Sequence, residues 1–287
     1  MSPPSFPSIG LALSGGAARG IAHVGVLRAL QENKIPINCV AGSSAGSLVG
    51  GALASGMTVD EIEALSRSLR WRHLGRMTLS RYGLQSNQRL ESFIRKRLPK
   101  TKFEELVMPF AVVATDLNTG TPVVMRDKGD VAFAIRASCT IPGLYVPVTD
   151  SEGRKLVDGG LVSVIPATVA RALGADIVIA VDVNIEGASF LGSSGSLIGV
   201  VLQSMLVVMK TASHLERSSA DYVIKPRVAH IRWDQIRRVE ELVAAGYEAG
   251  VESVPAIRGL IEKFLSESTG AVPNLSPESK DQLINVK

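Results

Sequence analysis

The sequence predicts an α/β protein with a three-layer α/β/α architecture and a mainly parallel central sheet. A strand, a glycine-rich turn and a helix follow one another twice between Ile9 and Ala54. Parallel strands need a helical crossover, so two consecutive units of this kind indicate a parallel sheet. The all-apolar run Ile177–Val181 is typical of a strand covered by helices on both faces. With 287 residues, 46 % of them hydrophobic, the chain is long enough for one large core.

The first two units are the clearest. The short apolar run Ile9–Leu13 is the expected first strand, and apolar residues at helical spacing follow over Gly20–Leu30. The second strand, Cys39–Ala41, enters a turn that leads into a helix over Leu48–Ala54. Both strands therefore end in small residues that precede a helix.

The rest of the chain continues this alternation. Two helices separated by a basic and less regular region are expected at Asp60–Leu69 and Asn87–Leu98. Later strands are expected at Phe110–Ala114, Lys155–Val157 and Ile177–Val181, and later helices at Val131–Ala137, Ala167–Leu173 and from Asp234 to about Leu265. Residues 1–8 are expected to be a disordered lead-in, 9–268 a single domain and 269–287 a loose polar tail.

The composition is that of a globular protein. Charged residues make up 20 % of the chain and are well mixed. The net charge of +4 and the pI of about 9.1 suit contact with anionic partners and are also ordinary for an enzyme. Aromatic residues are sparse, at 5 %, and match no recognition motif, so no nucleic-acid partner is expected. Cys39 and Cys139 lie in apolar stretches, as expected of buried thiols in a reducing compartment.

Two apolar stretches resemble membrane spans but fit other structures better. The uncharged stretch between Lys34 and Asp60 is broken by Pro36 and is rich in Gly and Ser, which favours a strand, a turn and a helix. The run Leu197–Met209, about 13 residues, is too short to span a bilayer and is expected to be a core helix. Because the N-terminus lacks a signal-peptide pattern, a cytoplasmic location is expected.

The segment Gly42-Ser43-Ser44-Ala45-Gly46 matches the pattern G-x-S-x-G. In that pattern the serine occupies a sharp turn between a strand and a helix, and the flanking Gly42 and Gly46 let the chain bend tightly. At the helix N-terminus, Ser44 would also benefit from the helix dipole and free N–H groups as negative charge develops. The simpler alternative is a glycine turn between packed elements.

A second turn, Gly15-Gly16-Ala17-Ala18-Arg19-Gly20, offers backbone N–H groups at a helix start, which suits an oxyanion hole. A dinucleotide-binding fingerprint is disfavoured, because Ala17 replaces its middle glycine and no acidic residue ends the next strand. Arg19 is interpreted as holding a phosphate, bracing the loop or lying in solvent.

A third turn, Asp158-Gly159-Gly160, places a carboxylate at the carboxyl end of the expected strand Lys155–Val157. Ligands of open parallel sheets bind at such ends. A carboxylate beside Ser44 could accept its proton directly or through a histidine. The alternative is an ordinary turn with an Asx hydrogen bond.

In chain order, these turns together with Ala134–Gly143 (AIRASCTIPG) resemble the patatin-like phospholipase family, and more narrowly its short bacterial members. The resemblance covers Ile9 to Asp182. It implies a lipid acyl hydrolase with a Ser–Asp dyad and neither a cofactor nor a metal. Ser44 would be the nucleophile, Asp158 the base, and the N–H groups of Gly15, Gly16 and Ala17 the oxyanion hole.

The chain departs from the family pattern at two positions. Ala17 stands where the family usually has a third glycine, but it keeps its N–H, so the hole is expected to survive. Ser163 stands where many members have asparagine, which affects a local hydrogen bond rather than the chemistry.

A Ser–His–Asp triad is the alternative to the dyad, and it requires a suitably placed histidine, usually after the acid. The chain has four histidines. His23 and His73 precede Asp158, whereas His214 and His230 follow it. Chain order therefore leaves only the last two as candidates.

Arginines and lysines gather between residues 67 and 81 and again between residues 95 and 102. The cluster comprises Arg67, Arg70, Arg72, Arg76, Arg81, Arg95, Lys96, Arg97, Lys100 and Lys102, with Trp71 and His73 among them. It is interpreted either as a surface for an anionic membrane, which would make the protein peripheral to the inner face, or as a solvated helical face.

The turn motifs do not specify the leaving group. A serine protease and a thioesterase are therefore alternatives to the lipid substrate that the resemblance implies, and a weakly catalytic lipid-binding regulator is the alternative from another class.

Overall fold

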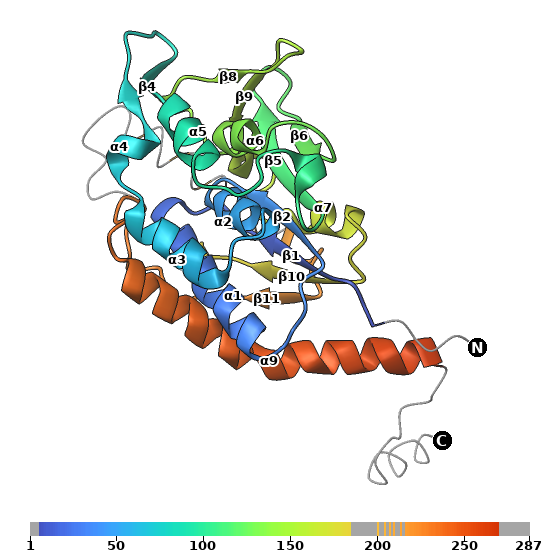
Figure 1. Ribbon diagram of the computed structural model, residues 1–287. Coiled ribbons are helices and arrows are strands. Elements are labelled where there is room, and N and C mark those ends of the chain that lie inside the picture. Colours follow the sequence, from blue (N-terminus) through green and yellow to red (C-terminus); the bar gives the residue numbers. More distant parts are fainter. Residues whose placement is uncertain are drawn as a thin grey trace, which may run out of the picture.

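The computed structural model describes residues 6–184, 200, 204, 207, 209, 213 and 216–269. An eight-stranded sheet occupies the centre, with helices on both faces (Figure 1). Its parallel part runs in the order β11 (Tyr222–Ile224), β10 (Ile177–Val181), β1 (Ile9–Leu13), β2 (Cys39–Ser43) and β5 (Phe110–Asp116). The predicted three-layer α/β/α class with a mainly parallel sheet is confirmed.

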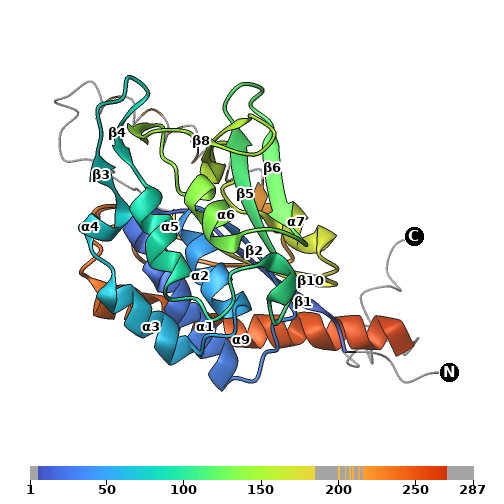
Figure 2. The same ribbon diagram turned by 45° about the horizontal axis from the view of Figure 1, so that its top comes forward.

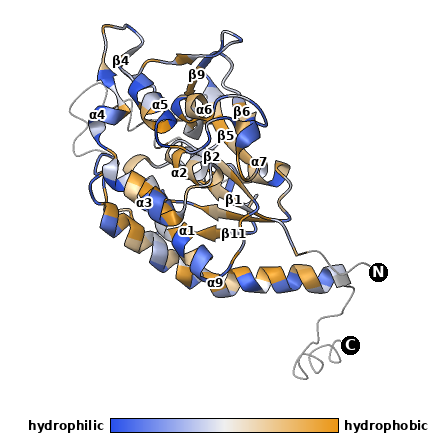
Figure 3. Cartoon of the chain, viewed as in Figure 1, coloured by the Kyte–Doolittle hydropathy of each residue, from blue (hydrophilic) through white to orange (hydrophobic). Residues whose placement is uncertain are grey.

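Side chains alternate between the two faces of β1, as the pleat of a strand requires. Ile9, Leu11 and Leu13 are buried in the larger core, together with residues of α1 (Ala22–Glu32), α2 (Ala45–Ala54) and α9 (Val239–Thr269). Ala12 points to the other face, against α7 (Ala167–Ala172). Figures 1 and 2 show α1 and α9 on one side of the sheet and α7 on the other. The residues of the parallel strands are mostly apolar, as Figure 3 shows for β1 and β11.

Beyond β5 the sheet continues with antiparallel strands. These are β6 (Pro122–Arg126), β9 (Lys155–Asp158) and β8 (Val148–Thr149). The strand expected at 155–157 is therefore present, but the interpretation that it shares the carboxyl edge of the parallel strands is wrong. Because β9 runs against β5 and pairs Asp158 with Ala114, it delivers the carboxylate from the opposite direction. Val113, the preceding residue of β5, pairs with Ser43 at the end of β2, so Asp158 still ends beside Ser44.

A small second sheet projects from the domain. It contains β3 (Arg76–Met77), β4 (Gly83–Ser86) and β7 (Gly143–Tyr145). Figure 2 shows α5 (Gln88–Arg95) and α6 (Val131–Ser138) between this small sheet and β5, with α4 (Trp71–Leu74) below β3. Helix α3 (Val59–Ser68) packs against α1, α2 and α9 instead. Three short 3₁₀ helices complete the described elements: η1 (Ala17–Ile21), η2 (Phe103–Glu105) and η3 (Gly159–Leu161). The sequence patterns did not indicate this second sheet.

The uncharged stretch after Lys34 forms β2, a turn and α2, as predicted. The core helix expected at Leu197–Met209 lies largely outside the described residues. No helix in the described ranges is both long enough and apolar enough to cross a bilayer. The predicted domain boundaries stay a prediction, although the Ser8 carbonyl already accepts hydrogen bonds from the N–H groups of Asp176 and Ile177.

Candidate active site

Ser44 forms the sharp turn between β2 and α2. Its backbone has φ 48° and ψ −122°, a conformation that costs a non-glycine residue energy and that clusters at functional sites. A Cβ on Gly46 would lie 2.2 Å from the Leu13 carbonyl oxygen, and one on Gly42 would lie 2.6 Å from Ser47 Cα. Both glycines of the motif are therefore required by close backbone packing around the serine.

The Ser44 hydroxyl donates a hydrogen bond of 2.8 Å to Oδ2 of Asp158. The carboxylate is held in place from several sides. Its Oδ1 accepts a bond from the Gly160 N–H at 2.9 Å, and the backbone carbonyl of Asp158 accepts one from Thr115 Oγ1 at 2.7 Å. The Asp158 N–H donates to the carbonyl of Thr140. The structure thus brings together the two residues that the sequence placed in separate turns.

Burial raises the pKa of Asp158 to about 6, against the opposing effect of the Gly160 N–H and the Ser44 hydroxyl. Desolvation disfavours the charged form of a carboxyl group. A carboxylate with this pKa is still ionised at neutral pH, yet it is a stronger base than an exposed aspartate. That combination suits a residue that must accept a proton.

The backbone of Ser44 is held as tightly as its side chain. Its N–H donates to Ser138 Oγ at 2.7 Å, and this hydroxyl donates in turn to the Val113 carbonyl at 2.6 Å. The Ser44 carbonyl accepts bonds from the N–H and the hydroxyl of Ser47. Ser138 lies in the segment Ala134–Gly143 that carries the family resemblance, but nothing in the sequence indicated this role.

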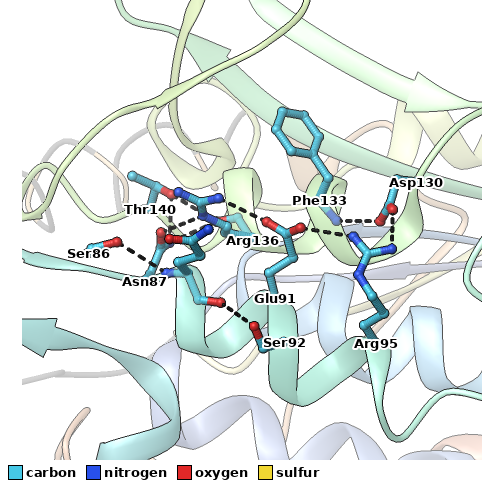
Figure 4. Close-up of polar contacts among 10 residues, drawn as sticks. Ser86, Asn87, Glu91, Ser92, Arg95, Asp130, Phe133, Arg136 and Thr140 are labelled. Carbon is cyan, nitrogen blue, oxygen red and sulfur yellow. Dashed lines mark hydrogen bonds and ion pairs between the residues drawn. The ribbon is translucent and has the colours of Figure 1, made fainter.

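A polar network between the start of α5 and the end of α6 fixes Thr140, as Figure 4 shows. Asn87, which is fully buried, donates to Thr140 Oγ1 at 2.8 Å and to the Arg136 carbonyl at 3.1 Å. The Arg136 guanidinium donates back to Asn87 Oδ1 and to Glu91. Because the Thr140 carbonyl binds the Asp158 N–H, this network supports the position of the carboxylate.

The glycine-rich turn lies directly beside the serine. A Cβ on Gly15 would lie 3.2 Å from Ser44 Cβ. The Gly15 N–H donates to the Val164 carbonyl, so it is occupied in this conformation. The N–H groups of Gly16 and Ala17 donate to no acceptor within the described residues. Two of the three candidate oxyanion donors are thus available, and Ala17 takes the left-handed φ of 49°.

Arg19 is fully buried, so the interpretation as a solvated arginine is wrong. Its Nε donates to the Ile231 carbonyl at 2.7 Å, which ties the glycine turn to the segment before α9. Burial lowers the pKa of Arg19. The geometry agrees with a bracing role for this side chain.

Ser163, the second departure from the family pattern, follows the Asp158 turn. Gly159 accepts the Ser163 N–H at 2.9 Å through its carbonyl, and Ser163 is buried. The residue that departs from the family pattern is therefore buried, and its backbone N–H closes the turn that follows Asp158.

An apolar pocket opens at Ser44. Helices α2, α3, α4 and α5, the glycine turn and β7 supply its wall. Most of the lining side chains are apolar or aromatic: Ala17, Ala18, Ile21, Ala45, Leu48, Val49, Ala52, Ile62, Leu65, Leu69, Trp71, Leu74, Leu90, Phe93, Cys139, Ile141, Leu144, Tyr145, Trp233 and Ile236. Ser44 and Ser66 add hydroxyl groups. Such a surface favours a hydrocarbon chain over a polar group.

None of the histidines described by the structure hydrogen-bonds to Ser44 or Asp158. His23 Nε2 bonds to the Ser14 carbonyl, and burial lowers the pKa of His23 to about 4. His73 accepts the Arg70 N–H, and His230 bonds to Glu241 on the surface. His214 lies outside the described residues.

Comparison with known proteins gives the family. A sequence profile described as patatin-like phospholipase matches residues 11–171. The chain belongs to the patatin-like phospholipase family. The recognition made from the three turns is thereby confirmed.

Relatives of this family member differ in length. The uncharacterized NTE family protein Rv1063c of Mycobacterium tuberculosis is 38 % identical over 183 residues, which is 63 % of this chain and 50 % of that protein. Lysophospholipase NTE1 of Mycosarcoma maydis is 39 % identical over 185 residues, 62 % of this chain and 10 % of that protein. The chain thus spans half or less of these relatives.

Among solved structures, VipD from Legionella pneumophila matches with a TM-score of 0.59 at 15 % identity, covering 88 % of this chain and 67 % of that chain. This likeness shows the shared fold.

Proposed function

We propose that this patatin-like protein is a serine acyl hydrolase that cleaves lipid esters with a Ser44–Asp158 dyad. The observation that carries the proposal is the 2.8 Å hydrogen bond from the Ser44 hydroxyl to Asp158, made where the apolar pocket meets the glycine turn. A nucleophile, a base within hydrogen-bond reach and free N–H donors together provide the parts that acyl transfer needs.

The reaction would proceed in two steps. Ser44 Oγ attacks the ester carbonyl carbon as its proton passes to Asp158, and the N–H groups of Gly16 and Ala17 stabilise the oxyanion. Collapse expels the alcohol, which takes the proton from Asp158, and leaves an acyl group on Ser44. Water then attacks this ester, Asp158 again accepts the proton, and the fatty acid leaves with Ser44 restored.

A phospholipid or a lysophospholipid is the proposed substrate. The support is the apolar lining beside Ser44, which matches an acyl chain, and the names of relatives such as the lysophospholipase NTE1 of Mycosarcoma maydis. The protein would act in the cytoplasm, peripherally at the inner, anionic face of the membrane where such lipids reside.

Turnover of a short-chain nitrophenyl ester tests the chemistry. The wild type should hydrolyse it, and Ser44→Ala should lose the activity while keeping the folded far-UV circular dichroism spectrum. Equal rates for the two proteins would reject the dyad and favour a lipid-binding regulator. A panel of lysophospholipid, diacyl phospholipid, acyl thioester and peptide then identifies the leaving group, and preference for thioester or peptide would reject the lipid assignment.

A further inference from the structure

The hairpin formed by β3 and β4, residues 76–86, presents large apolar side chains to solvent. Leu79 at its tip is fully exposed and Met77 is 68 % exposed. Tyr82 and Leu84 on the second arm are also exposed, as is Trp71 in the preceding helix α4. Soluble monomers seldom gather so many exposed apolar side chains in one short segment unless the segment has a partner. We call residues 76–86 the tip hairpin.

The charge around the tip hairpin is of one sign. From residue 64 to residue 90 the chain contains six arginines and no acidic residue. In the described part of the chain, Arg72, Arg76 and Arg81 form no ion pair with a carboxylate, whereas Arg67 pairs with Glu63 and Glu240. Arg95, further along the basic cluster, pairs with Glu91 and Asp130. Arginines of the cluster without a carboxylate partner thus lie on α4 and the tip hairpin, next to the exposed apolar side chains.

The base of the tip hairpin is fixed to the domain. β4 pairs with β7 through Gln85 and Tyr145, and the Val146 N–H donates to the Gln85 carbonyl at 2.9 Å. The next residue after β4 is the buried Asn87, which binds Thr140 and Arg136 (Figure 4). The exposed tip therefore projects from a rigid base, so binding through it orders few additional residues.

The elements next to the tip hairpin also line the apolar pocket at Ser44. Trp71 and Leu74 of α4, and Leu144 and Tyr145 of β7, belong to the pocket wall. Figure 2 shows β3 and β4 projecting from the domain, away from α1 and α9. A surface bound by the tip hairpin would therefore lie close to the entrance of the pocket.

We propose that the tip hairpin is a membrane anchor that inserts Met77 and Leu79 into the interface of an anionic bilayer. Arg72, Arg76 and Arg81 lie at the level of the phosphate groups, and Tyr82 lies at the polar boundary, where tyrosine is favoured. The charge complementarity selects an anionic lipid surface as the partner. The delivery of a lipid acyl chain to Ser44 rests on the proposed function, whereas the anchoring itself does not.

Cosedimentation with vesicles tests the anchor. The full chain should bind equimolar phosphatidylcholine–phosphatidylglycerol vesicles and bind phosphatidylcholine vesicles much more weakly. Met77→Ser/Leu79→Ser should weaken binding to the anionic vesicles by roughly a hundredfold, because each of the two buried apolar side chains contributes about a factor of ten. Val107→Ser is the matched control, since this exposed side chain lies before β5, at the end of that strand remote from Ser44.

A second pair of variants tests the charge. Arg76→Gln/Arg81→Gln should weaken binding to anionic vesicles and reduce its dependence on salt, because each cation near the surface contributes to attraction within a Debye length. Lys100→Gln/Lys128→Gln removes the same charge near the N-terminal end of α6 and should leave binding unchanged.

Three outcomes would overturn the anchor: no binding of the wild type to anionic vesicles, equal binding by Met77→Ser/Leu79→Ser, or concentration-dependent self-association that this variant abolishes. The last would assign the hairpin to a contact between copies of the chain. The variant should hydrolyse a soluble nitrophenyl ester at the wild-type rate and lose activity only on vesicles. If Ser44→Ala matches wild type on the soluble ester while vesicle binding persists, the proposed function fails and the anchor stands.

Discussion

Ser138 joins the backbone of Ser44, the proposed nucleophile, to the central strand β5. Its hydroxyl accepts the Ser44 N–H at 2.7 Å and donates to the Val113 carbonyl at 2.6 Å. The strained conformation of Ser44 is thereby held by a fully buried side chain that is not part of the pocket lining. Ser138 is a positioning residue in this arrangement.

Ser138→Ala should lower kcat about tenfold or more with little change in KM, because the Ser44 N–H loses its acceptor and the turn relaxes. The free energy of unfolding should fall by about 1–3 kcal/mol, the cost of a buried N–H without a partner. Steady-state kinetics and urea denaturation measure the two effects. Ser138→Thr, which keeps the hydroxyl, should restore part of kcat.

Ser55→Ala is the matched control, since Ser55 is equally buried but its hydroxyl only donates to the Ala52 carbonyl. It should change stability without changing kcat. A similar loss of kcat in both variants would mean that Ser138 acts only through general stability.

The raised pKa of Asp158 predicts the pH profile of the reaction. Below about pH 6 the carboxyl group is protonated and cannot accept the Ser44 proton, so kcat/KM should fall about tenfold per pH unit below that value and level off above it. Initial rates on a nitrophenyl ester across this range give the profile.

Histidine variants distinguish the Ser–Asp dyad from a Ser–His–Asp triad. His230→Ala and His214→Ala should leave both the rate and the profile largely unchanged under the dyad mechanism. Abolished hydrolysis in either folded variant would replace the dyad by a triad.

Asp158→Asn should lower the rate of ester hydrolysis and, at neutral pH, raise the free energy of unfolding. The rate should fall by about 10²–10⁴, the usual contribution of a general base. The folded-state pKa of Asp158, about 6, lies above its ordinary value of 3.8, so the folded protein binds the proton more tightly than the unfolded chain. The stability of the wild type therefore falls as pH rises through this window, by about 3 kcal/mol for two pKa units.

Asp158→Asn has no titrating carboxyl group at this position, so this pH-dependent loss of stability is absent from it. Its stability relative to wild type should increase between about pH 4 and pH 6 and stay constant above, as urea denaturation at several pH values would reveal. A pH-independent difference would mean that Asp158 is not desolvated in the folded state.

Ala17→Gly should stabilise the protein by about 1 kcal/mol, because alanine is strained at the left-handed φ of 49° and glycine is not. Turnover should be retained, since the backbone N–H is unchanged. Ala18→Gly is the control: Ala18 lies in the same 3₁₀ turn without a positive φ, so its replacement should be destabilising. Thermal denaturation compares the two, and an equal loss in both would show that the Ala17 backbone carries no strain.

The sequence predicted most of the parallel core because its signals are local. The strand Ile177–Val181 has the bounds of β10, and the strand–turn–helix units around Gly15 and Ser44 follow from apolar periodicity and glycine spacing. These patterns are set by burial against neighbouring helices. The same local signals identified Ser44 and Asp158 as candidates.

The rest depends on contacts between distant segments. The two-residue strands β3 and β8 are too short for a periodic pattern, and the antiparallel direction of β9 depends on its pairing with β5. Ser138 and Asn87 look like ordinary polar residues in helical segments until the fold brings them against Ser44 and Thr140. The hydrogen bond from the Gly15 N–H to the Val164 carbonyl is likewise a contact between distant segments.

Because β9 is antiparallel to β5, the proposed catalytic pair forms only when β9 pairs with β5 in the correct register. Ser44 and Asp158 lie at the ends of two strands that are not neighbours, with β5 between them, so their meeting requires both ladders to be correctly aligned. A slip of β9 by one residue would turn the carboxylate to the opposite face of the sheet. The esterase activity recovered during refolding would therefore report the fraction of molecules in which β9 has paired correctly with β5. Spectroscopic probes of helix content would not detect this step.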